Sequence, residues 1–421
     1  MNQQIKKSWI TVPDHSDFTI YNIPFGVYSD HNIPHRVCTA IGEKVLDLHE
    51  LYSHGYLNGL DLSIDVLSRP DLNDFIALGK KKTNAIRKRL IELLEADNTT
   101  LKNNTEVHQS LFKHQHAVKM LLPVQIGDYT DFYSSVDHAT NVGKMFRDPQ
   151  NALLPNWKHL PVGYHGRASS IVVSGHSFHR PKGQMKPAEV ETPVFGPCKL
   201  LDFELEMAFV IGKETKMGES ISTENADEFI FGMMLFNDWS ARDIQTWEYV
   251  PLGPFLAKNF ASTISPWVVT LEALEPFRTA GYIQEPKVLP YLEYNGNKNI
   301  DINLEVYIEP EQSTPTKVCS SNYKYMYWTM EQQLAHHTVN GCNIRVGDLM
   351  ASGTISGPEP NEFGSMLELT WRGTKPIKMS DGTERKFIND SDTVIMKGWC
   401  EKDGVRVGFG ECTAKVLPAV L

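Results

Sequence analysis

The run from Leu201 to Val210 constrains the fold more than any other stretch of this 421-residue chain. Read with a period of two residues, its apolar side chains fall on one side of a strand and its acidic side chains on the other. The apolar set is Phe203, Leu205, Met207 and Phe209, and the acidic set is Asp202, Glu204 and Glu206. Carboxylates at alternate strand positions lie roughly 6.6 Å apart and repel one another unless a cation lies between them. The run therefore fits either a solvated strand face or a site for a hard divalent cation.

A second apolar run, residues 229–236, predicts a buried strand that ends at Asn237 and Asp238, and Asp238 offers a third carboxylate. From Asp238 onward the spacing becomes helical, and Pro251 ends the pattern. One face of this short helix would carry Asp238, Arg242, Gln245 and Tyr249. Such a face fits an ordinary surface helix with an Asp–Arg pair. It fits equally well a row of donors beside a metal, suited to an anionic substrate or a developing oxyanion.

Composition argues against several classes of function. The hydrophobic fraction of 41% and the charged fraction of 22% describe an ordinary soluble globular protein. The formal net charge of −10 argues against nucleic acid and against an anionic membrane as partners. No apolar run approaches the roughly 20 residues that a membrane helix needs. The six cysteines form no C-x-x-C pair, which favours free thiols in a reducing compartment and therefore a cytoplasmic protein.

The chain divides by its patterns into a small N-terminal part and a larger, mostly β C-terminal part. Brief β-like runs precede residue 72, and the clearest helix spans 74–96. The polar tract 97–106 is the best candidate for a linker or domain edge, and a new unit begins near Leu121. Beyond it, β-rich runs and turn signals dominate, among them 302–308, 366–371 and 393–396, with one helix over 325–337. We predict a mainly β (α+β) fold with domains at 1–118 and 119–421.

Two more residues suit acid–base chemistry. His138 ends a polar stretch that begins at Asp128; histidine is the commonest general base, although a histidine in a polar loop is more often structural. Glu368 lies in the apolar run 366–371, where a carboxylate either faces solvent or needs a partner. As a partner it would orient and polarise His138. The sequence contains no nucleophile elbow, P-loop, dinucleotide fingerprint or zinc spacing, so a histidine-activated water beside an oxygen-ligated cation fits what remains.

Several longer runs resemble the fumarylacetoacetase family, and the resemblance extends from roughly Asp17 to Pro418. The runs are 128–135, 153–170, 237–245, 247–255, 352–357 and 364–369. The resemblance implies a small N-terminal SH3-like β-barrel, a larger C-terminal β-sandwich or β-roll domain that bears the site, and assembly as a homodimer. It also implies a hydrolase that cleaves a carbon–carbon bond of 4-fumarylacetoacetate to give fumarate and acetoacetate, the last step of tyrosine and phenylalanine catabolism.

The resemblance further implies a role for each residue of the site. The ligands of a bound Ca²⁺ or Mg²⁺ would be Asp131, Glu204, Glu206 and Asp238. His138 would activate water with Glu368 as its orienting partner, and the groups facing the oxyanion would be Arg242, Gln245 and Lys258. The carboxylate-bearing arms of the diketo acid would be held by Tyr133, Arg147, Tyr164, Gln245, Tyr249 and Thr354. A further cation site would use Asp238, the backbone carbonyl of Lys258 and the hydroxyl of Ser262. The structural neighbours of the site would be Asp128, Asp137 and Asp202.

Two other functions fit parts of the same pattern. A relative with the same scaffold would be a β-keto acid decarboxylase or isomerase, which product analysis distinguishes from a hydrolase. A non-catalytic calcium-binding β protein would use the acidic cluster for stability alone. Neither accounts for the face that carries Arg242, Gln245 and Tyr249, or for a His138–Glu368 pair, as well as the hydrolase does.

Overall fold

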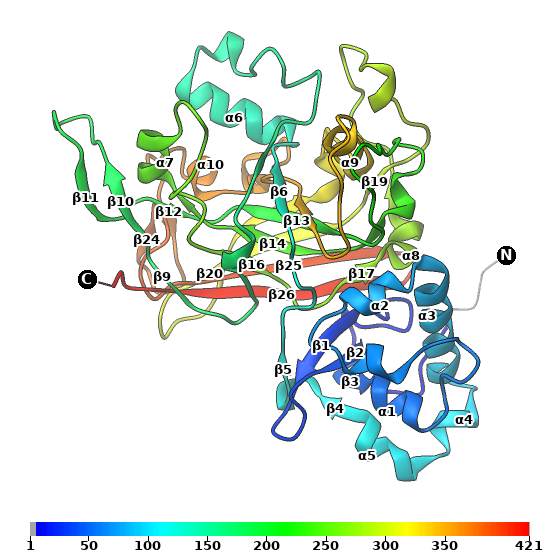
Figure 1. The fold of residues 1–421 in the computed structure, drawn as a ribbon. Coiled ribbons are helices and arrows are strands. Elements are labelled where there is room, and N and C mark those ends of the chain that lie inside the picture. Colours follow the sequence, from blue (N-terminus) through cyan, green and yellow to red (C-terminus); the bar gives the residue numbers. More distant parts are fainter. Residues whose placement is uncertain (1–5, 421) are drawn as a thin grey trace.

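The computed structural model describes residues 6–420 and shows a mainly β chain with a small N-terminal part against a larger C-terminal part (Figure 1). The smaller part is built on an antiparallel sheet in the order β4-β3-β2-β1-β5. Its strands are β1 (Phe25–Ser29), β2 (Arg36–Ile41), β3 (Lys44–Asp47), β4 (Phe112–His114) and β5 (Lys119–Met120). The first five residues of the predicted domain 1–118 lie outside the described residues, and β5 follows directly after that domain's predicted end.

The helix predicted over 74–96 is wrong in its extent. The structure has two helices there, α2 (Asn73–Ala77) and α3 (Lys80–Leu94). Gly79 between them adopts a φ of 83°, which no α-helical residue can have. The apolar stripe of α3 packs into the core of the N-terminal part through Ile86, Leu90, Leu93 and Leu94.

The tract 97–106 is not a linker, contrary to the prediction. It contains α4 (Thr99–Lys102), and the chain continues through α5 (His108–Leu111) into β4 of the same sheet. The Asn98 side chain accepts a hydrogen bond from the backbone N–H of Thr100, which caps α4. Polar residues are common both in linkers and at helix N-termini, and here the capping role is the one observed.

Two sheets stack in the C-terminal part. The larger has the order β7-β6-β22-β13-β14-β16-β8, with β17 paired to β14, and the smaller has the order β21-β20-β25-β26-β9. The larger comprises β6 (Tyr129–Phe132), β7 (Gly163–His165), β8 (Ile171–Val173), β13 (Leu205–Ile211), β14 (Ile230–Asp238), β16 (Ser262–Ile264), β17 (Val269–Thr270) and β22 (Leu349–Ala351). The smaller comprises β9 (Phe178–His179), β20 (Asn303–Glu309), β21 (Thr316–Asn322), β25 (Thr393–Lys402) and β26 (Val405–Leu417). Leu205, Met207 and Phe209 of β13 share one core with Val306, Met396 and Phe409, so the predicted sandwich architecture is confirmed.

The opposite face of the larger sheet has an apolar half and an acidic half. Its apolar half packs against the N-terminal part through Ala208, Val210, Met234 and Phe236. Because alternate side chains of a strand share a face, Glu206 and Asp238 continue this face beyond Ala208 and Phe236. The N-terminal part therefore covers the apolar half of the face, and the carboxylates gather on the remainder.

Short helices lie near the acidic half (Figure 1). They are α6 (Val136–Phe146), α7 (Arg242–Glu248), α9 (Met330–Thr338) and α10 (Met366–Leu369). The strand predicted over 366–371 is wrong, because this segment forms the single turn of α10. The helix predicted over 325–337 begins later, at Met330, where Thr329 and Gln332 form a capping box.

Two further observations bear on the predicted environment of the protein. All six cysteines are free, and five of them are buried. Within residues 6–420, no helix has both the length and the apolar character required to cross a lipid bilayer.

A buried carboxyl on α9 leads to a prediction about stability. Glu331 is fully buried, and its Oε1 lies 2.8 Å from Nη1 of Arg278. Burial raises the pKa of Glu331 from 4.5 to about 7, although the charge of Arg278 opposes the increase. Between these pH values the folded protein keeps a proton that the unfolded chain has released, so this contribution to stability is lost as pH rises. We expect Glu331→Gln to melt like the parent protein near pH 4.5 and at a higher temperature at pH 8.

Glu305 provides the control for this measurement by differential scanning fluorimetry. Burial by itself would raise the pKa of Glu305. Hydrogen bonds from Tyr307 and Lys317 outweigh burial, so the pKa lies below its ordinary value. Its contribution is therefore present above the unfolded pKa, and Glu305→Gln should not raise the melting temperature at pH 8. An equal difference between Glu331→Gln and the parent at both pH values would contradict the prediction.

Candidate metal centre and active site

Four carboxylates converge on the acidic half of the larger sheet. Asp131, Glu204, Glu206 and Asp238 are all buried, and one ligand oxygen from each lies within 4.8 Å of the others. Asp131 lies on β6, Glu206 on β13 and Asp238 at the end of β14. The strand predicted over 201–210 is interrupted between β12 (Leu201–Asp202) and β13, and Glu204 lies in this interruption, bridged to Ser365. The fold therefore brings together three carboxylates that the sequence pattern indicated, those of Glu204, Glu206 and Asp238, and a fourth, that of Asp131, which only the family resemblance implied.

The cluster has the electrostatic character of a cation site. Burial, followed by repulsion from neighbouring carboxylates, raises the pKa of both Asp131 and Glu206. Among the described residues, Oδ1 of Asp131 and Oε1 of Glu206 are buried without a hydrogen-bond partner. Unpartnered buried carboxylate oxygens are costly, and a hard divalent cation would satisfy them. The residues present therefore fit Ca²⁺ or Mg²⁺.

Lys258 borders this cluster, and its ammonium contacts two of the carboxylates. Its Nζ lies 2.5 Å from Oε2 of Glu204 and 2.7 Å from Oδ2 of Asp238. Burial raises the pKa of Glu204, but the charges of Lys258 and Arg242 outweigh burial and lower it below the ordinary value. Burial likewise lowers the pKa of Lys258, yet Asp238 and Glu204 outweigh it and raise that pKa. Both partners are therefore charged, and an ammonium with two of its three hydrogens engaged keeps one donor free.

Asp238 has two hydroxyl neighbours in addition to Lys258. The Ser262 hydroxyl donates to Oδ1 of Asp238 at 2.9 Å, and the Tyr164 hydroxyl donates to Oδ2 at 3.2 Å. Ser262 lies on β16, beside the end of β14, so its position follows from the pairing of these strands. The further cation site at Asp238, Lys258 and Ser262 stays a prediction.

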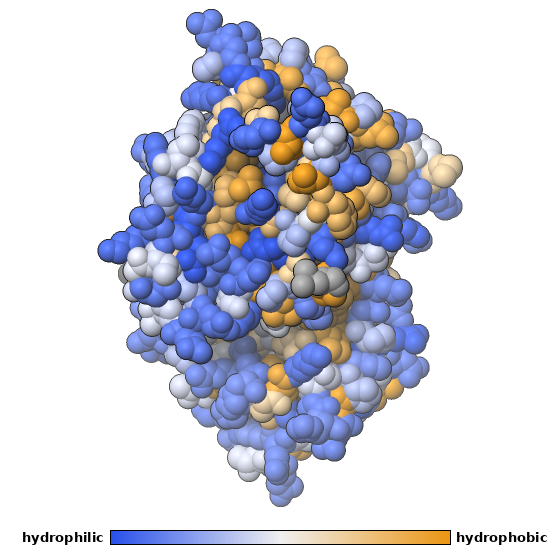
Figure 2. All heavy atoms as spheres, turned by 90° about the vertical axis from the view of Figure 1, so that its left-hand side faces the viewer, coloured by the Kyte–Doolittle hydropathy of each residue, from blue (hydrophilic) through white to orange (hydrophobic). Residues whose placement is uncertain are grey.

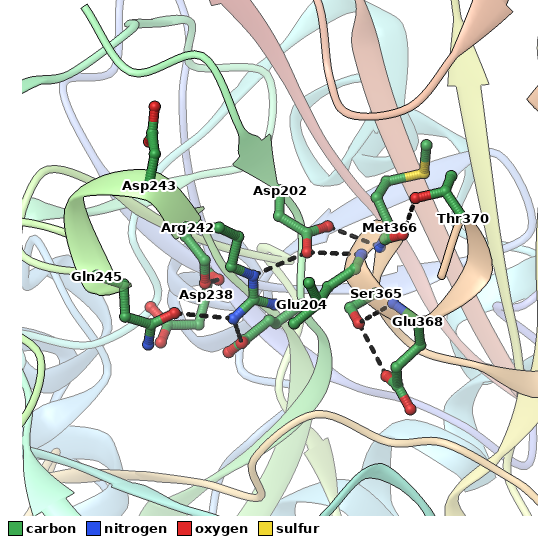
Figure 3. A network of polar contacts seen from close by, with 12 residues as sticks. Asp202, Glu204, Asp238, Arg242, Asp243, Gln245, Ser365, Met366, Glu368 and Thr370 are labelled. Carbon is green, nitrogen blue, oxygen red and sulfur yellow. Dashed lines mark hydrogen bonds and ion pairs between the residues drawn. The ribbon is translucent and has the colours of Figure 1, made fainter. Parts of the chain in front are cut away.

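Arg242 begins α7 and directs its guanidinium into the cluster (Figure 3). Its Nη1 lies 2.8 Å from Oε1 of Glu204 and 3.2 Å from Oε1 of Gln245. Its Nη2 is buried and has no hydrogen-bond partner among the described residues. A buried donor without a partner is the group that a substrate oxygen would satisfy. The predicted helical face begins at Arg242 rather than at Asp238, because Asp238 belongs to β14.

His138 and Glu368 form a buried pair. Nδ1 of His138, on α6, lies 2.7 Å from Oε2 of Glu368, on α10. Burial raises the pKa of Glu368, but the nearby His138 and several hydrogen bonds outweigh burial and lower it, so the carboxylate is ionised. With Nδ1 held by Glu368, Nε2 is the ring nitrogen left for proton transfer. Tyr133 packs edge-on against this imidazole, with ring centroids 5.2 Å apart.

Three other residues predicted to bind substrate lie at the surface or make no hydrogen bond to the four carboxylates within the described residues. Tyr249 is 52% exposed at the end of α7, and Arg147 is exposed, with its Nη1 donating to the carbonyl of Ala152. Thr354 is buried. Within residues 6–420, no hydrogen bond joins these three side chains to the four carboxylates. Their contacts with substrate stay predictions.

Sequence reasoning missed the side chains that hold Glu368 in place. Its carboxylate accepts hydrogen bonds from Asn141 at 3.0 Å, Ser365 at 2.8 Å and Ser356 at 3.0 Å. Ser356 and Ser365 belong to runs that carry the family resemblance, which is the only signal that would have identified them. The neighbours Asp128 and Asp137 have other partners, Arg345 and Tyr282.

Comparisons with known proteins agree with this site. A model described as "Fumarylacetoacetate (FAA) hydrolase C-terminal" matches residues 128–417, and one described as "Fumarylacetoacetase N-terminal" matches residues 21–123. The chain is 55% identical over 417 residues to the fumarylacetoacetase of Homo sapiens, covering 98% of this chain and 99% of that protein. It is 54% identical over 421 residues to the fumarylacetoacetase of Dictyostelium discoideum, covering 99% of each. A solved fumarylacetoacetate hydrolase from Exiguobacterium antarcticum shares the fold, with a TM-score of 0.52 and 16% identity over 94% of this chain and 99% of that one.

Proposed function

The chain belongs to the fumarylacetoacetase family, and from this premise we propose that it hydrolyses the carbon–carbon bond of 4-fumarylacetoacetate to fumarate and acetoacetate. This reaction would be the last step of tyrosine and phenylalanine catabolism. The observation that carries the proposal is the buried His138–Glu368 pair beside four convergent carboxylates. A protein that bound calcium for stability alone would have no use for this pair.

The difficult event is the departure of a carbon atom with its bonding electrons. A divalent cation bound by Asp131, Glu204, Glu206 and Asp238 would supply Lewis-acid stabilisation of the enolate that leaves. His138 removes a proton from water as the water oxygen attacks the fumaroyl carbonyl carbon. The bond from that carbon to the acetoacetate fragment then breaks, and His138 returns the proton to the leaving carbon. Glu368 stays ionised throughout and holds the imidazole in orientation.

Three donors on one side of the cluster suit the oxyanion that forms on the attacked carbonyl. Nη2 of Arg242 has no hydrogen-bond partner within residues 6–420, and two hydrogens of the Lys258 ammonium are engaged there, which leaves the third to donate. Gln245 accepts from Arg242 through its oxygen, which leaves its amide nitrogen to donate. Each such donor contributes on the order of 3 kcal/mol to the transition state.

The function is tested by following the ultraviolet absorbance of the diketone as purified protein is added, with and without a chelator. We expect the absorbance to decay, the products to be fumarate and acetoacetate, and the decay to stop when the cation is removed. Release of carbon dioxide, or a product without net cleavage, would favour a decarboxylase or isomerase of the same scaffold. No consumption of any diketo acid would overturn the proposal.

We also propose that the resident cation is Ca²⁺ or Mg²⁺ and that the protein works in the cytoplasm. Four carboxylate oxygens without a thiolate favour a hard cation. Six free cysteines favour a reducing compartment. Melting curves of the metal-free protein with each cation at equal concentration distinguish the two ions, because the tighter ligand stabilises the fold more.

We propose that the protein is a homodimer that associates through the side bearing α7. Large apolar side chains are exposed there after the helix, and Figure 2 shows apolar atoms gathered among polar ones on this side. They include Val250 (66% exposed), Leu252 (97%) and Phe255 (67%), with Phe195 (72%) on the nearby hairpin of β10 (Lys182–Met185) and β11 (Val194–Pro197). Several large apolar side chains exposed on one side favour an association site there.

The expected result is that Leu252→Asp with Phe255→Asp converts the protein to a monomer. Light scattering should give twice the 47.6 kDa chain mass for the parent protein and one chain mass for the double variant. Ile283→Asp is the control, because Ile283 is 87% exposed outside this surface. A monomeric parent, or a dimeric double variant, would refute the proposed surface.

A further inference from the structure

One buried carboxylate, that of Asp202, joins the two halves of the proposed site (Figure 3). Its Oδ2 accepts a hydrogen bond from Nε of Arg242 at 2.9 Å and another from the backbone N–H of Leu367 at 3.0 Å. Its Oδ1 accepts from the backbone N–H of Met366 at 2.7 Å. The side chain therefore contacts the guanidinium at the start of α7 and the first turn of α10 at the same time.

The first turn of α10 depends on these contacts. A helix begins with N–H groups that have no partner inside the helix, and a helix of four residues makes too few internal bonds to fix its own position. Asp202 accepts from the first two of these groups, those of Met366 and Leu367. The third, that of Glu368, donates to the Ser365 hydroxyl at 3.3 Å. Asp202 thereby sets the direction of the turn that carries Glu368 toward His138.

The guanidinium of Arg242 is fixed by the same carboxylate. Its Nε is held by Asp202, and its Nη1 is held by Glu204 and Gln245. Because a guanidinium is rigid and planar, these contacts also fix the direction of Nη2, which is buried and has no partner in the described part of the chain. Without Asp202, the plane would keep contacts only at Nη1 and could rotate about them.

The backbone around Asp202 is tied to both elements as well. β12, which contains Asp202, pairs with β15 (Ser240–Ala241), and Arg242 follows β15 directly. Three residues after Asp202, the N–H of Leu205 donates to the carbonyl of Gly364 at 2.9 Å, beside the start of α10. The segment therefore lies between α7 and α10 and contacts each through its backbone and through the Asp202 side chain.

We propose that Asp202 is a positioning residue, which holds the oxyanion donor Arg242 and the His138–Glu368 pair in one fixed geometry so that both act on the same carbonyl group. It acts through these residues and is not itself expected to touch the substrate. The proposal rests on the proposed hydrolase function. It goes beyond the sequence-based expectation that Asp202 is only a structural neighbour.

Asp202→Asn is the direct test, because the amide has the shape of the carboxylate but only one acceptor oxygen. In one orientation the amide NH2 group faces the N–H of Met366, and in the other it faces the N–H groups of Arg242 and Leu367. Either way a donor meets a donor, and at least one hydrogen bond is lost. We expect kcat to fall roughly 100-fold, as for a misplaced oxyanion donor, while KM changes less than about threefold. Asp17→Asn is the matched control, because Asp17 accepts from Arg406 at 2.9 Å and from the N–H of Gly410 at 3.1 Å. The control should keep the parent kcat.

A double-mutant cycle separates positioning from a general loss of stability. If Asp202 acts partly through Glu368, then Asp202→Asn combined with Glu368→Gln should lose less in kcat than the product of the two single losses. The Asp17→Asn change should have no effect on kcat in either background. The proposal would be overturned if the double variant lost kcat by the full product of the two single losses, or if Asp202→Asn kept the parent kcat. An inactive parent protein would instead overturn the proposed function.

A second measurement covers the outcome in which Asp202→Asn does not fold. Hydrogen exchange of the segment 364–370 is compared between the parent and Arg242→Gln, in which Asp202 is intact but has lost its charged partner. We expect the amides of Met366 and Leu367 to exchange roughly tenfold faster in the variant, since a charge-assisted hydrogen bond of the shared carboxylate is lost. Unchanged exchange would show that Arg242 and α10 are not coupled through Asp202, and the proposal would fail.

Discussion

Glu206→Ala is expected to lose its bound cation and its activity together. One oxygen of Glu206 accepts from the backbone N–H of Gly353 at 3.0 Å, while the other is buried with no partner among the described residues. The second oxygen is therefore the one available to a cation, and three remaining ligands hold Ca²⁺ or Mg²⁺ poorly. Metal content after dialysis and the initial rate of diketone consumption should both fall to near background.

The choice of Glu206 over Glu204 makes this result easier to interpret. Glu204 also pairs with Lys258 and Arg242, so its removal would take one of two carboxylate partners from each of these buried cations. Glu331→Gln is the matched control, because this carboxylate is equally buried and lies outside the cluster. Full turnover by a metal-free Glu206→Ala protein would show that the cation is not required.

The strands of the site could be predicted because their information is local. The alternation of Phe203, Leu205 and Met207 with acidic residues predicts an apolar face and an acidic face. The apolar face is observed, and two of the three acidic residues, Glu204 and Glu206, lie in the cluster. Asp238 was placed beside the cluster by the abrupt end of the apolar run before it. The roles of these carboxylates, in contrast, were left open by their spacing and came from the family resemblance.

The elements that were predicted wrongly from the sequence depend on contacts with distant residues. The apolar residues around Glu368 have a strand-like composition, and a single helical turn is too short to reveal a period of 3.6 residues. The groups that make it helical are Ser365 and Asp202, and Asp202 lies more than 160 residues earlier in the chain. The same alternation that placed Asp202 on a face with Glu204 fails at the interruption between β12 and β13, so its side chain reaches α10 instead.

The acidic half of the sheet shows why the fold and the site depend on each other. The N-terminal part buries Ala208 and Phe236 of the larger sheet, and the same two strands carry Glu206 and Asp238. Like charges at this spacing oppose folding unless they are neutralised. Lys258 and Arg242 supply two of the positive charges, and the unpartnered oxygens of Asp131 and Glu206 leave a place for a divalent cation. A bound cation would therefore serve both the stability of this face and the proposed chemistry.

His138→Ala is expected to lower kcat roughly 10²- to 10⁴-fold while cation and substrate binding persist. His138 contacts Glu368 and is not among the four residues proposed to bind the cation. Its removal therefore leaves the cation ligands intact. Glu368 would still accept hydrogen bonds from Asn141, Ser356 and Ser365, so α10 should keep its place. The loss should therefore be confined to proton transfer.

The measurement combines kcat with metal content and with the affinity for a non-hydrolysable diketo acid analogue. His337→Ala is the control. This imidazole is partly buried, whereas that of His138 is buried, and it lies 2.9 Å from the Thr130 hydroxyl, but its element, α9, contributes none of the proposed groups. An unchanged rate in His138→Ala would move the base to another residue. A loss of cation together with activity would instead give His138 a structural role, because a general base can be removed without disturbing four carboxylates on a rigid sheet.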